Sequence, residues 1–353
     1  MPLSTAQDDP PARAGRAAGA TPPSGWFDRF YFNAHTGTGT PYLLVGAGLY
    51  AEGGLADGYA VAVTDRVQHN LRMSERDAGA PSIGPLSWEV LEPLRRWRLR
   101  LTDNPSGLAF DLRWSARTEP WECRPITLDD RRGQVMTFEH AFQSGHYTGW
   151  LEVAGTRYDV TGWTGQRDRS RGRRMATARQ GLHLWVQAQF GDECVAFLYD
   201  LDRENRPTLL DGAVLGTTSS GRRPSDPITS VQHELAFADD LDTEGGRLWL
   251  TTRSGRRIEL AVRAGRNAGG FLGGAGYGSF HGVDHGPNHL EHDRWELTDP
   301  GLVPRALSYP LTDRLAGFTK TEAGHPDERG AGIFEFAHSR SPAYRYAPSV
   351  ARR

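Results

Sequence analysis

The 353-residue chain has few cysteines, very little lysine and no long hydrophobic run. Its two cysteines, Cys123 and Cys194, lie outside any CxxC motif and are too few for a disulfide framework. No stretch approaches the roughly 18 apolar residues that a membrane-spanning helix needs, and the N-terminus lacks the apolar core of a signal peptide. We therefore expect no integral membrane segment and a reducing, cytoplasmic location.

Lysine is nearly absent, so positive charge comes almost entirely from arginine, and Lys320 is the single lysine. The arginines are spread over every segment, and the formal net charge is −2. Such a balance creates no general electrostatic attraction for nucleic acid or for an anionic membrane. We expect no nucleic-acid partner.

Amphipathic helices are also scarce, and residues 126–132 and 311–315 are the two places where short ones are expected. Glycine (42 residues) and proline (22 residues) are abundant instead, which favours many short strands joined by turns. Apolar residues recur with period two, for example in 97–101 (WRLRL) and 108–114 (LAFDLRW). Residues 154–156 (AGT) are expected to form a hairpin turn. These patterns predict an all-β fold.

The length exceeds that of a usual single hydrophobic core, so two domains are expected. Residues 1–24 are rich in Pro, Ala, Gly, Asp and Arg without periodicity, which predicts a disordered tail. We expect a first β domain over 25–180 and a second over 181–345. Residues 217–224 (TTSSGRRP) are the best candidate for a linker or long loop near the boundary.

One motif resembles a dinucleotide-binding fingerprint, because residues 42–51 (YLLVGAGLYA) place GxGxxA after an apolar strand. That chemistry needs a helix directly after the glycines, so that the helix N-terminus faces the pyrophosphate. Here residues 52–58 (EGGLADG) are typical of a hairpin and lead into another strand. We therefore expect no nucleotide at this position.

The densest imidazole cluster is 281–293 (HGVDHGPNHLEHD), whose histidines and aspartates are suitable ligands for zinc or another divalent metal. His281, His285 and His289 are spaced by four, as on one helical face. Gly282, Gly286 and Pro287 oppose a helix there. We favour a loop at a pocket mouth, with His281 as a substrate-binding residue, and expect no bound metal.

The most informative segment is 162–174 (GWTGQRDRSRGRR), which has five arginines after Gln166 and one acid, Asp168. A solvated basic loop is the plainest interpretation of this segment. RNA binding is another, but the run of arginines has no aromatic residues interleaved for stacking on bases. A strand would place Asp168 and Ser170 on one face and the arginines on the other. The acid would then face a barrel interior and the arginines would face water.

Two opposite outcomes are open for Asp168. Enclosure in an apolar cavity would raise its carboxyl pKa and let it act as an acid, whereas contact with the arginines would lower that pKa. On the preceding strand, His146 and Tyr147 are candidate proton-transfer partners. Because neighbours on a strand face opposite sides, at most one of them points into the same cavity.

Residues 145–172 (GHYTGWLEVAGTRYDVTGWTGQRDRSRG) resemble the central motif of the AttH-like, hydroxyneurosporene-synthase-like double-lipocalin family. In that family a glycine-bearing strand precedes Arg-Asp-(His or Arg)-Ser-Trp-Gly. Residues 26–33 (WFDRFYFN) and 330–336 (GAGIFEF) also look like family sequence. This sequence departs from the motif at Arg171, where the family usually has tryptophan, and that departure puts the cavity wall or catalysis in doubt.

The resemblance implies two lipocalin-like (calycin) antiparallel β-barrels packed side by side around an apolar cavity. Carotenoid 1,2-hydratase, kievitone hydratase and, more remotely, fungal Diels–Alder cyclases are relatives in that family. By motif position, the resemblance implies that Asp168 is the candidate acid.

Two functional hypotheses follow. The first is a cofactor-independent hydratase or cyclase acting on an isoprenoid, polyene or polyketide, in which Asp168 protonates an alkene with help from Tyr147 or His146. Trp163 would stabilise a developing carbocation, and Trp150 and Ser170 would contact the substrate. The alternative is a non-catalytic lipocalin-like carrier of a hydrophobic small molecule, which Arg171 favours. A metal-dependent enzyme using 281–293 is a third hypothesis.

Overall fold

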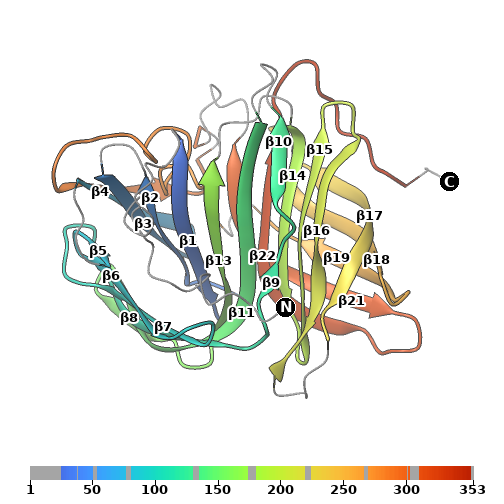
Figure 1. Cartoon of the computed structure of the whole chain (residues 1–353), viewed down its shortest axis with the longest axis horizontal. Coiled ribbons are helices and arrows are strands. Elements are labelled where there is room, and N and C mark those ends of the chain that lie inside the picture. The colour runs from blue at the N-terminus through green and yellow to red at the C-terminus, as the bar shows by residue number, and fades with distance from the viewer. Residues whose placement is uncertain are drawn as a thin grey trace.

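The computed structural model describes residues 25–37, 39–50, 54–76, 81–129, 135–173, 180–218, 224–265, 269–299, 301–302 and 310–350. These residues form 22 strands and no α-helix (Figure 1). The expected tail 1–24, Arg174 and residues 219–223 of the expected linker lie outside the described residues. The all-β prediction is confirmed.

Fourteen strands form one open sheet that curls into a half-barrel. Its main path runs in the order β20-β4-β3-β2-β1-β13-β11-β8-β7-β6-β5, and β9, β10 and β12 pair with β11. Its strands are β1 (Trp26–His35), β2 (Tyr42–Tyr50), β3 (Leu55–Thr64), β4 (Val67–Arg76), β5 (Ser82–Ile83), β6 (Leu86–Glu92), β7 (Arg96–Leu101), β8 (Leu108–Ala116), β9 (Trp121–Glu122), β10 (Ile126–Asp129), β11 (Val135–Val153), β12 (Thr156–Asp159), β13 (Thr164–Arg173) and β20 (His289–Glu296).

The other eight strands close into an antiparallel barrel, on the right in Figure 1. They are β14 (Gln180–Gln189), β15 (Glu193–Asp202), β16 (Pro207–Gly216), β17 (Asp226–Phe237), β18 (Thr243–Thr252), β19 (Arg257–Arg263), β21 (Leu311–Glu322) and β22 (Glu328–His338). Pairing of β22 with β14 completes the closure, for example at Val186 and Phe334. Closure leaves no unpaired edge, which stabilises an all-β unit.

Burial along the strands shows which faces pack. In β8 and β19 every second residue is more deeply buried, as expected when one face covers a core and the other meets water. Strands β2, β3, β14 and β15 are buried at nearly every position. These four strands are covered on both faces because the half-barrel and the barrel pack against each other there.

Three apolar cores follow from this arrangement. One fills the half-barrel and includes Trp97 and Trp114, and a second fills the closed barrel and includes Phe197. The third lies between the two units, where Leu44 of β2 and Trp185 of β14 belong to the same cluster. The relative position of the two units is therefore fixed by an apolar interface.

The C-terminal half of the chain also contributes a strand to the half-barrel. β20 pairs with β4 along its whole length, and Arg72 of β4 binds Glu291 and Asp293 of β20. Residues 269–288 connect the barrel to this strand (orange in Figure 1). The chain thus returns to the first unit, and the division at 180/181 stays a prediction.

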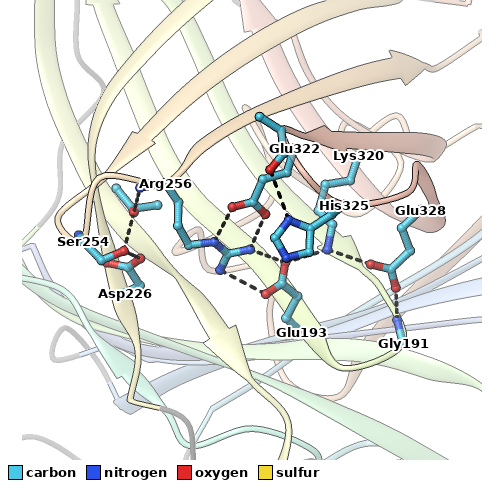
Figure 2. Close-up of polar contacts among 11 residues, drawn as sticks. Gly191, Glu193, Asp226, Ser254, Arg256, Lys320, Glu322, His325 and Glu328 are labelled. Carbon is cyan, nitrogen blue, oxygen red and sulfur yellow. Dashed lines mark hydrogen bonds and ion pairs between the residues drawn. The ribbon is translucent and has the colours of Figure 1, made fainter.

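A partly buried ion-pair network joins the hairpins at one end of the barrel (Figure 2). Arg256 lies between Glu193 (3.0 Å) and Glu322 (2.7 Å), and Lys320 binds Glu193 and Glu328 at 2.6 Å each. Burial alone would raise the pKa of Glu193, but hydrogen bonds from Arg256 and Lys320 outweigh burial and lower it. Lys320, the single lysine of the chain, therefore stabilises this end of the barrel through its ion pairs.

Two local expectations from the sequence are wrong. Ile126–Asp129 forms β10 and Leu311–Glu322 forms β21, where short helices were expected. Both segments pair with long strands, so tertiary pairing outweighs weak helical periodicity. The expected absence of a helix after 42–51 is confirmed, because β2 leads to β3, and the 154–156 turn joins β11 to β12. Among the described residues, no helix is long and apolar enough to span a membrane.

Candidate active site

A pocket with an empty volume of about 820 Å³, part of it open to solvent, lies between the half-barrel and the closed barrel. Its walls come from β1, β11 and β13 on one side and from β14, β15 and β22 on the other. Phe27, Phe138 and Trp185 supply apolar surface. A pocket of this kind, mostly apolar with a few convergent polar groups, is typical of a small-molecule site.

Strand β13 places two of the sequence-predicted residues in this pocket. Asp168 and Ser170 both line it, and both side chains are buried. Asp168 lies opposite Tyr31 of β1 and Phe142 of β11. Ser170 lies opposite His140, and its hydroxyl is 2.8 Å from the His140 Nδ1. The predicted alternation of β13 therefore brings Asp168 and Ser170 to one face.

The arginines of β13 occupy the opposite face, but the prediction that they meet water is wrong. Arg167 is buried against the Trp97 and Trp114 rings inside the half-barrel. Arg169 is buried in a two-pronged ion pair with Asp28. The half-barrel curls around this face, so these guanidinium groups lie in its interior.

Arg171 makes an ion pair of 2.7 Å with Glu139, which is its register partner on β11. Both residues alternate with pocket-facing ones, so Arg171 points away from the pocket. The departure from the family motif at this position does not alter the pocket wall.

Sequence reasoning missed a carboxyl pair on the barrel side of the pocket. Asp313 of β21 and Glu335 of β22 lie directly opposite each other, and Glu335 lines the pocket. The Tyr31 hydroxyl donates a 2.6 Å hydrogen bond to Asp313 Oδ2. Burial, with the nearby charges of Glu335 and Asp168, raises the pKa of Asp313 well above its usual range. Burial therefore favours the protonated form of Asp313, next to Glu335 on the neighbouring strand.

A histidine holds the other side of Glu335. His183 Nε2 lies 2.9 Å from Glu335 Oε1, and His183 Nδ1 lies 2.5 Å from Asp200 Oδ1. Burial alone would lower the pKa of His183, but the two carboxylates outweigh it and raise that pKa to about 10. His183 is thus an imidazolium at neutral pH and places a positive charge beside Glu335.

The opposite part of the pocket is basic and phenolic. Arg29 of β1 lines it together with Tyr59 and Tyr277, and the Arg29 guanidinium carbon lies 5.0 Å from the Tyr277 ring centre. Despite burial, the neighbouring phenols and Asp57 raise the pKa of Arg29 above its ordinary value. The half-barrel wall of the pocket therefore holds a permanent cation as well as the Asp168 carboxyl, and the barrel wall holds Glu335 with Asp313 opposite it.

The structure does not bring the other predicted site residues into this pocket. Tyr147 and Trp163 are buried in the half-barrel core, where the Tyr147 hydroxyl donates to the Asn33 carbonyl oxygen. His146 is exposed, and Trp150 packs under Arg157 at 3.9 Å. Of the two neighbours on β11, Tyr147 faces an interior, but that interior is on the far side of the sheet from Asp168.

His281 lies beside the pocket without lining it. Its Nδ1 is 3.1 Å from Asp57, and its ring packs against Tyr59 and Tyr277, which do line the pocket. Residues 281–288 form turns and loop, and His289 begins β20, so the spacing by four is not on a helix. Across the described ranges, no group of three or more His, Cys, Asp or Glu side chains is arranged to hold a metal ion.

Two of the residues that sequence reasoning missed had a signal in the sequence. Tyr31 lies within 26–33 and Glu335 within 330–336, the two outer segments that carry the family resemblance. His183, Asp200 and Asp313 have no local motif. They meet because β14, β15, β21 and β22 are neighbours around the barrel, which a single sequence does not reveal.

Known structures share this fold. Kievitone hydratase from Nectria haematococca aligns with a TM-score of 0.51 at 14% identity over 90% of this chain and 91% of that chain. An AttH-like protein from Nitrosomonas europaea aligns at 0.57 and 11% identity (89% and 92%). CghA, solved with Sch210972, aligns at 0.51 and 14% identity (89% of each). The expected double-lipocalin fold, with two units side by side, is confirmed.

No curated protein matches the sequence. A family model matches residues 7–341, nearly the whole chain. The chain therefore belongs to the family of unknown function DUF8625.

Proposed function

We propose that this protein is a cofactor-independent hydratase or cyclase acting on an apolar, unsaturated small molecule such as an isoprenoid, polyene or polyketide. The observation that carries the proposal is the buried Asp313–Glu335 carboxyl pair at the wall of an aromatic pocket. Protonation of an alkene needs an acid shielded from bulk water, and the interface between the two units supplies that shielding. One structural neighbour is a kievitone hydratase, whose name agrees with this class, and another, CghA, was solved with the small molecule Sch210972.

The proton source is assigned to the Asp313–Glu335 pair, with Glu335 as the member that faces the substrate. Transfer of the shared proton to an alkene carbon leaves a carboxylate, which the His183 imidazolium stabilises at 2.9 Å. Trp185 and Phe138 line the space in which positive charge develops on the substrate. Positive charge next to an aromatic face is favourable, so these rings stabilise the cation.

In place of the acid role that the resemblance implies, Asp168 is proposed as the catalytic base on the opposite wall, because the Asp313–Glu335 pair supplies the proton. In hydration, the oxygen of a water molecule bonds to the cationic carbon and Asp168 takes the released proton. In cyclisation, a second alkene of the substrate attacks the cation, and Asp168 removes the proton whose loss restores neutrality. Asp168 and the Asp313–Glu335 pair are thus two acid–base groups with separate roles.

We also propose a cytoplasmic location, with which the two free cysteines agree.

The test begins with mass spectrometry of small molecules that co-purify with the protein, followed by their incubation with it in water labelled with heavy oxygen. Hydration adds one labelled oxygen, and cyclisation changes retention time without changing mass. Glu335→Gln and Asp168→Asn are each expected to lower turnover at least 100-fold while the molecule still binds. Glu139→Gln, on the opposite face of the same sheet, is the matched control.

Rate against pH gives a second test. Turnover is expected to fall as pH rises through the raised pKa of Asp313, because the proton that the pair delivers to the substrate is then lost. If the co-purified molecule binds tightly and is returned unchanged, with no effect of Glu335→Gln, the protein is a carrier and the proposed reaction is excluded.

A further inference from the structure

One charge in the pocket plays no part in the proposed proton transfers. Arg29 lies on β1 in register with Ser170 of β13 and with Gly48 of β2, and its side chain runs over Gly48 toward the pocket. A Cβ at Gly48 would lie 2.8 Å from the Arg29 Cγ, so the glycine makes room for the arginine stem. The guanidinium is therefore held in the pocket wall by its packing.

Within the part of the chain that the structure describes, Arg29 makes no hydrogen bond and no ion pair. Asp57, whose charge helps to raise the pKa of Arg29, is already bound by the His281 ring at 3.1 Å, the Gly282 amide at 2.7 Å and the Tyr50 hydroxyl at 3.1 Å. The Arg29 side chain is partly exposed in the pocket wall, so solvent in the pocket satisfies its charge until a ligand displaces that solvent. Arg169, on the other face of the sheet, differs from Arg29 because the Asp28 carboxylate neutralises it.

Further polar groups lie next to this cation. Ser170 is opposite Arg29 on the neighbouring strand, and its hydroxyl is joined to His140. The phenols of Tyr59 and Tyr277 line the pocket beside Arg29. Guanidinium and hydroxyl groups together suit a carboxylate or an enolate oxygen, which accepts several hydrogen bonds at once.

We infer that the ligand of this pocket carries an anionic oxygen, a carboxylate or enolate, which Arg29 binds while the unsaturated part of the ligand lies against Glu335 and Trp185. This inference rests on the proposed function for the site and narrows its substrate class to acidic molecules. It also assigns Arg29 as the residue that fixes the orientation of the ligand. A neutral hydrocarbon would leave the guanidinium desolvated and unpaired.

The experiment uses two probes of equal shape, 1-naphthaleneacetic acid and 1-naphthaleneacetamide, titrated into the full-length protein at pH 8 and followed by tryptophan fluorescence and calorimetry. We expect the wild-type protein to bind the acid at least tenfold more tightly than the amide. Arg29→Gln is expected to remove that preference by weakening binding of the acid alone. Arg29→Lys is expected to keep part of that preference. Arg157→Gln, at an exposed arginine that packs on Trp150 away from the pocket, is expected to keep all of it.

Equal affinity of the wild-type protein for the two probes, or binding of neither up to their solubility limits, would overturn the inference, and that comparison needs no variant to fold. An acid preference that Arg29→Gln leaves intact, in a variant with an unchanged melting temperature, would also overturn it.

The result is separable from that of the proposed reaction. Glu335→Gln is expected to abolish turnover while keeping the preference for the acid probe. If the protein prefers the acid probe but shows no turnover, the proposed reaction is excluded and the anion site stands. If turnover depends on Glu335 but the two probes bind equally, the anion site is excluded and the reaction stands.

Discussion

Arg169 and Arg171 lie two residues apart on the same face of β13, yet their ion pairs differ sharply in burial. The side chains of Arg169 and Asp28 are each 3% exposed, whereas those of Arg171 and Glu139 are 28% and 55% exposed. Removing one partner of a buried pair leaves a charge that neither water nor protein compensates. The same residue type in the same motif therefore has very different energetic importance.

Asp28→Asn is expected to lower the free energy of unfolding by about 3–5 kcal/mol, because it leaves the Arg169 guanidinium buried without its counter-charge. Glu139→Gln is expected to cost less than about 1 kcal/mol, since its pair with Arg171 is open to solvent. Urea denaturation of both variants measures the difference. Similar losses for the two would contradict the assignment of Arg169 to the half-barrel interior.

The imidazolium of His183 gives a prediction with a defined pH window. Its folded-state pKa of about 10 lies above the ordinary value of 6.5, so the folded protein binds this proton more tightly than the unfolded chain. The resulting stabilisation is fully present below pH 6.5 and is lost as pH rises toward 10. Wild-type protein should therefore lose stability relative to His183→Gln across that window.

Chemical denaturation of the two proteins at matched pH values checks this, and an NMR titration of the His183 ring is a direct measure. A stability difference that does not change between pH 6.5 and pH 10 would show that His183 is neutral in the folded state, contrary to its position between Asp200 and Glu335.

At the scale of elements, strand assignments follow from the sequence more directly than the faces they present. Alternation in 97–101 and 108–114 correctly predicts β7 and β8, since one face of each covers the half-barrel core. It also separates Asp168 from the arginines of β13. It does not show that both faces of β13 are covered, because that depends on the curl of the sheet and on the packing of β14 and β15 against it.

The same limit explains why several residues of the pocket were not predicted from the sequence. Tyr147 and Trp163 were predicted to be near Asp168 because they are close to it in the sequence, but the faces of β11 and β13 place them on opposite sides of the sheet. Glu335 lies 167 residues after Asp168 in the chain (335 − 168), and only the barrel closure brings it to the pocket. Chain proximity is a poor guide to a site formed between two sheets.

Gly46 of β2 shows how one element makes room for another at the pocket. A Cβ at Gly46 would lie 2.6 Å from the Tyr59 ring of the neighbouring strand, which lines the pocket. Gly46→Ala is therefore expected to displace Tyr59, to cost about 1–3 kcal/mol of stability and to weaken binding of a pocket ligand.

Thermal unfolding and ligand titration measure these two effects. Gly39→Ala is the matched control, because nothing lies within 4 Å of the added methyl group, and it should change neither quantity. Unaltered ligand affinity in Gly46→Ala, despite lowered stability, would argue against a contact between Tyr59 and the ligand.

At the scale of the whole molecule, the half-barrel and the barrel depend on each other. The interface core contains residues of β2, β3, β14 and β15, and β20 returns from the barrel to pair with β4. The pocket exists because of this interface, since its carboxyl pair comes from one unit and Arg29 and Asp168 come from the other. Loss of the interface would therefore remove the site even if each sheet kept its strands.

Such an interface predicts that the chain unfolds as one cooperative unit. Leu44→Ala removes a fully buried side chain of the interface core and is expected to cost about 2–5 kcal/mol while keeping a single transition in calorimetry. Leu91→Ala, at a side chain 42% exposed, should change stability by less than about 0.5 kcal/mol. Two separate transitions, with Leu44→Ala lowering only one of them, would mean that the units fold independently and that the pocket forms by docking of preformed halves.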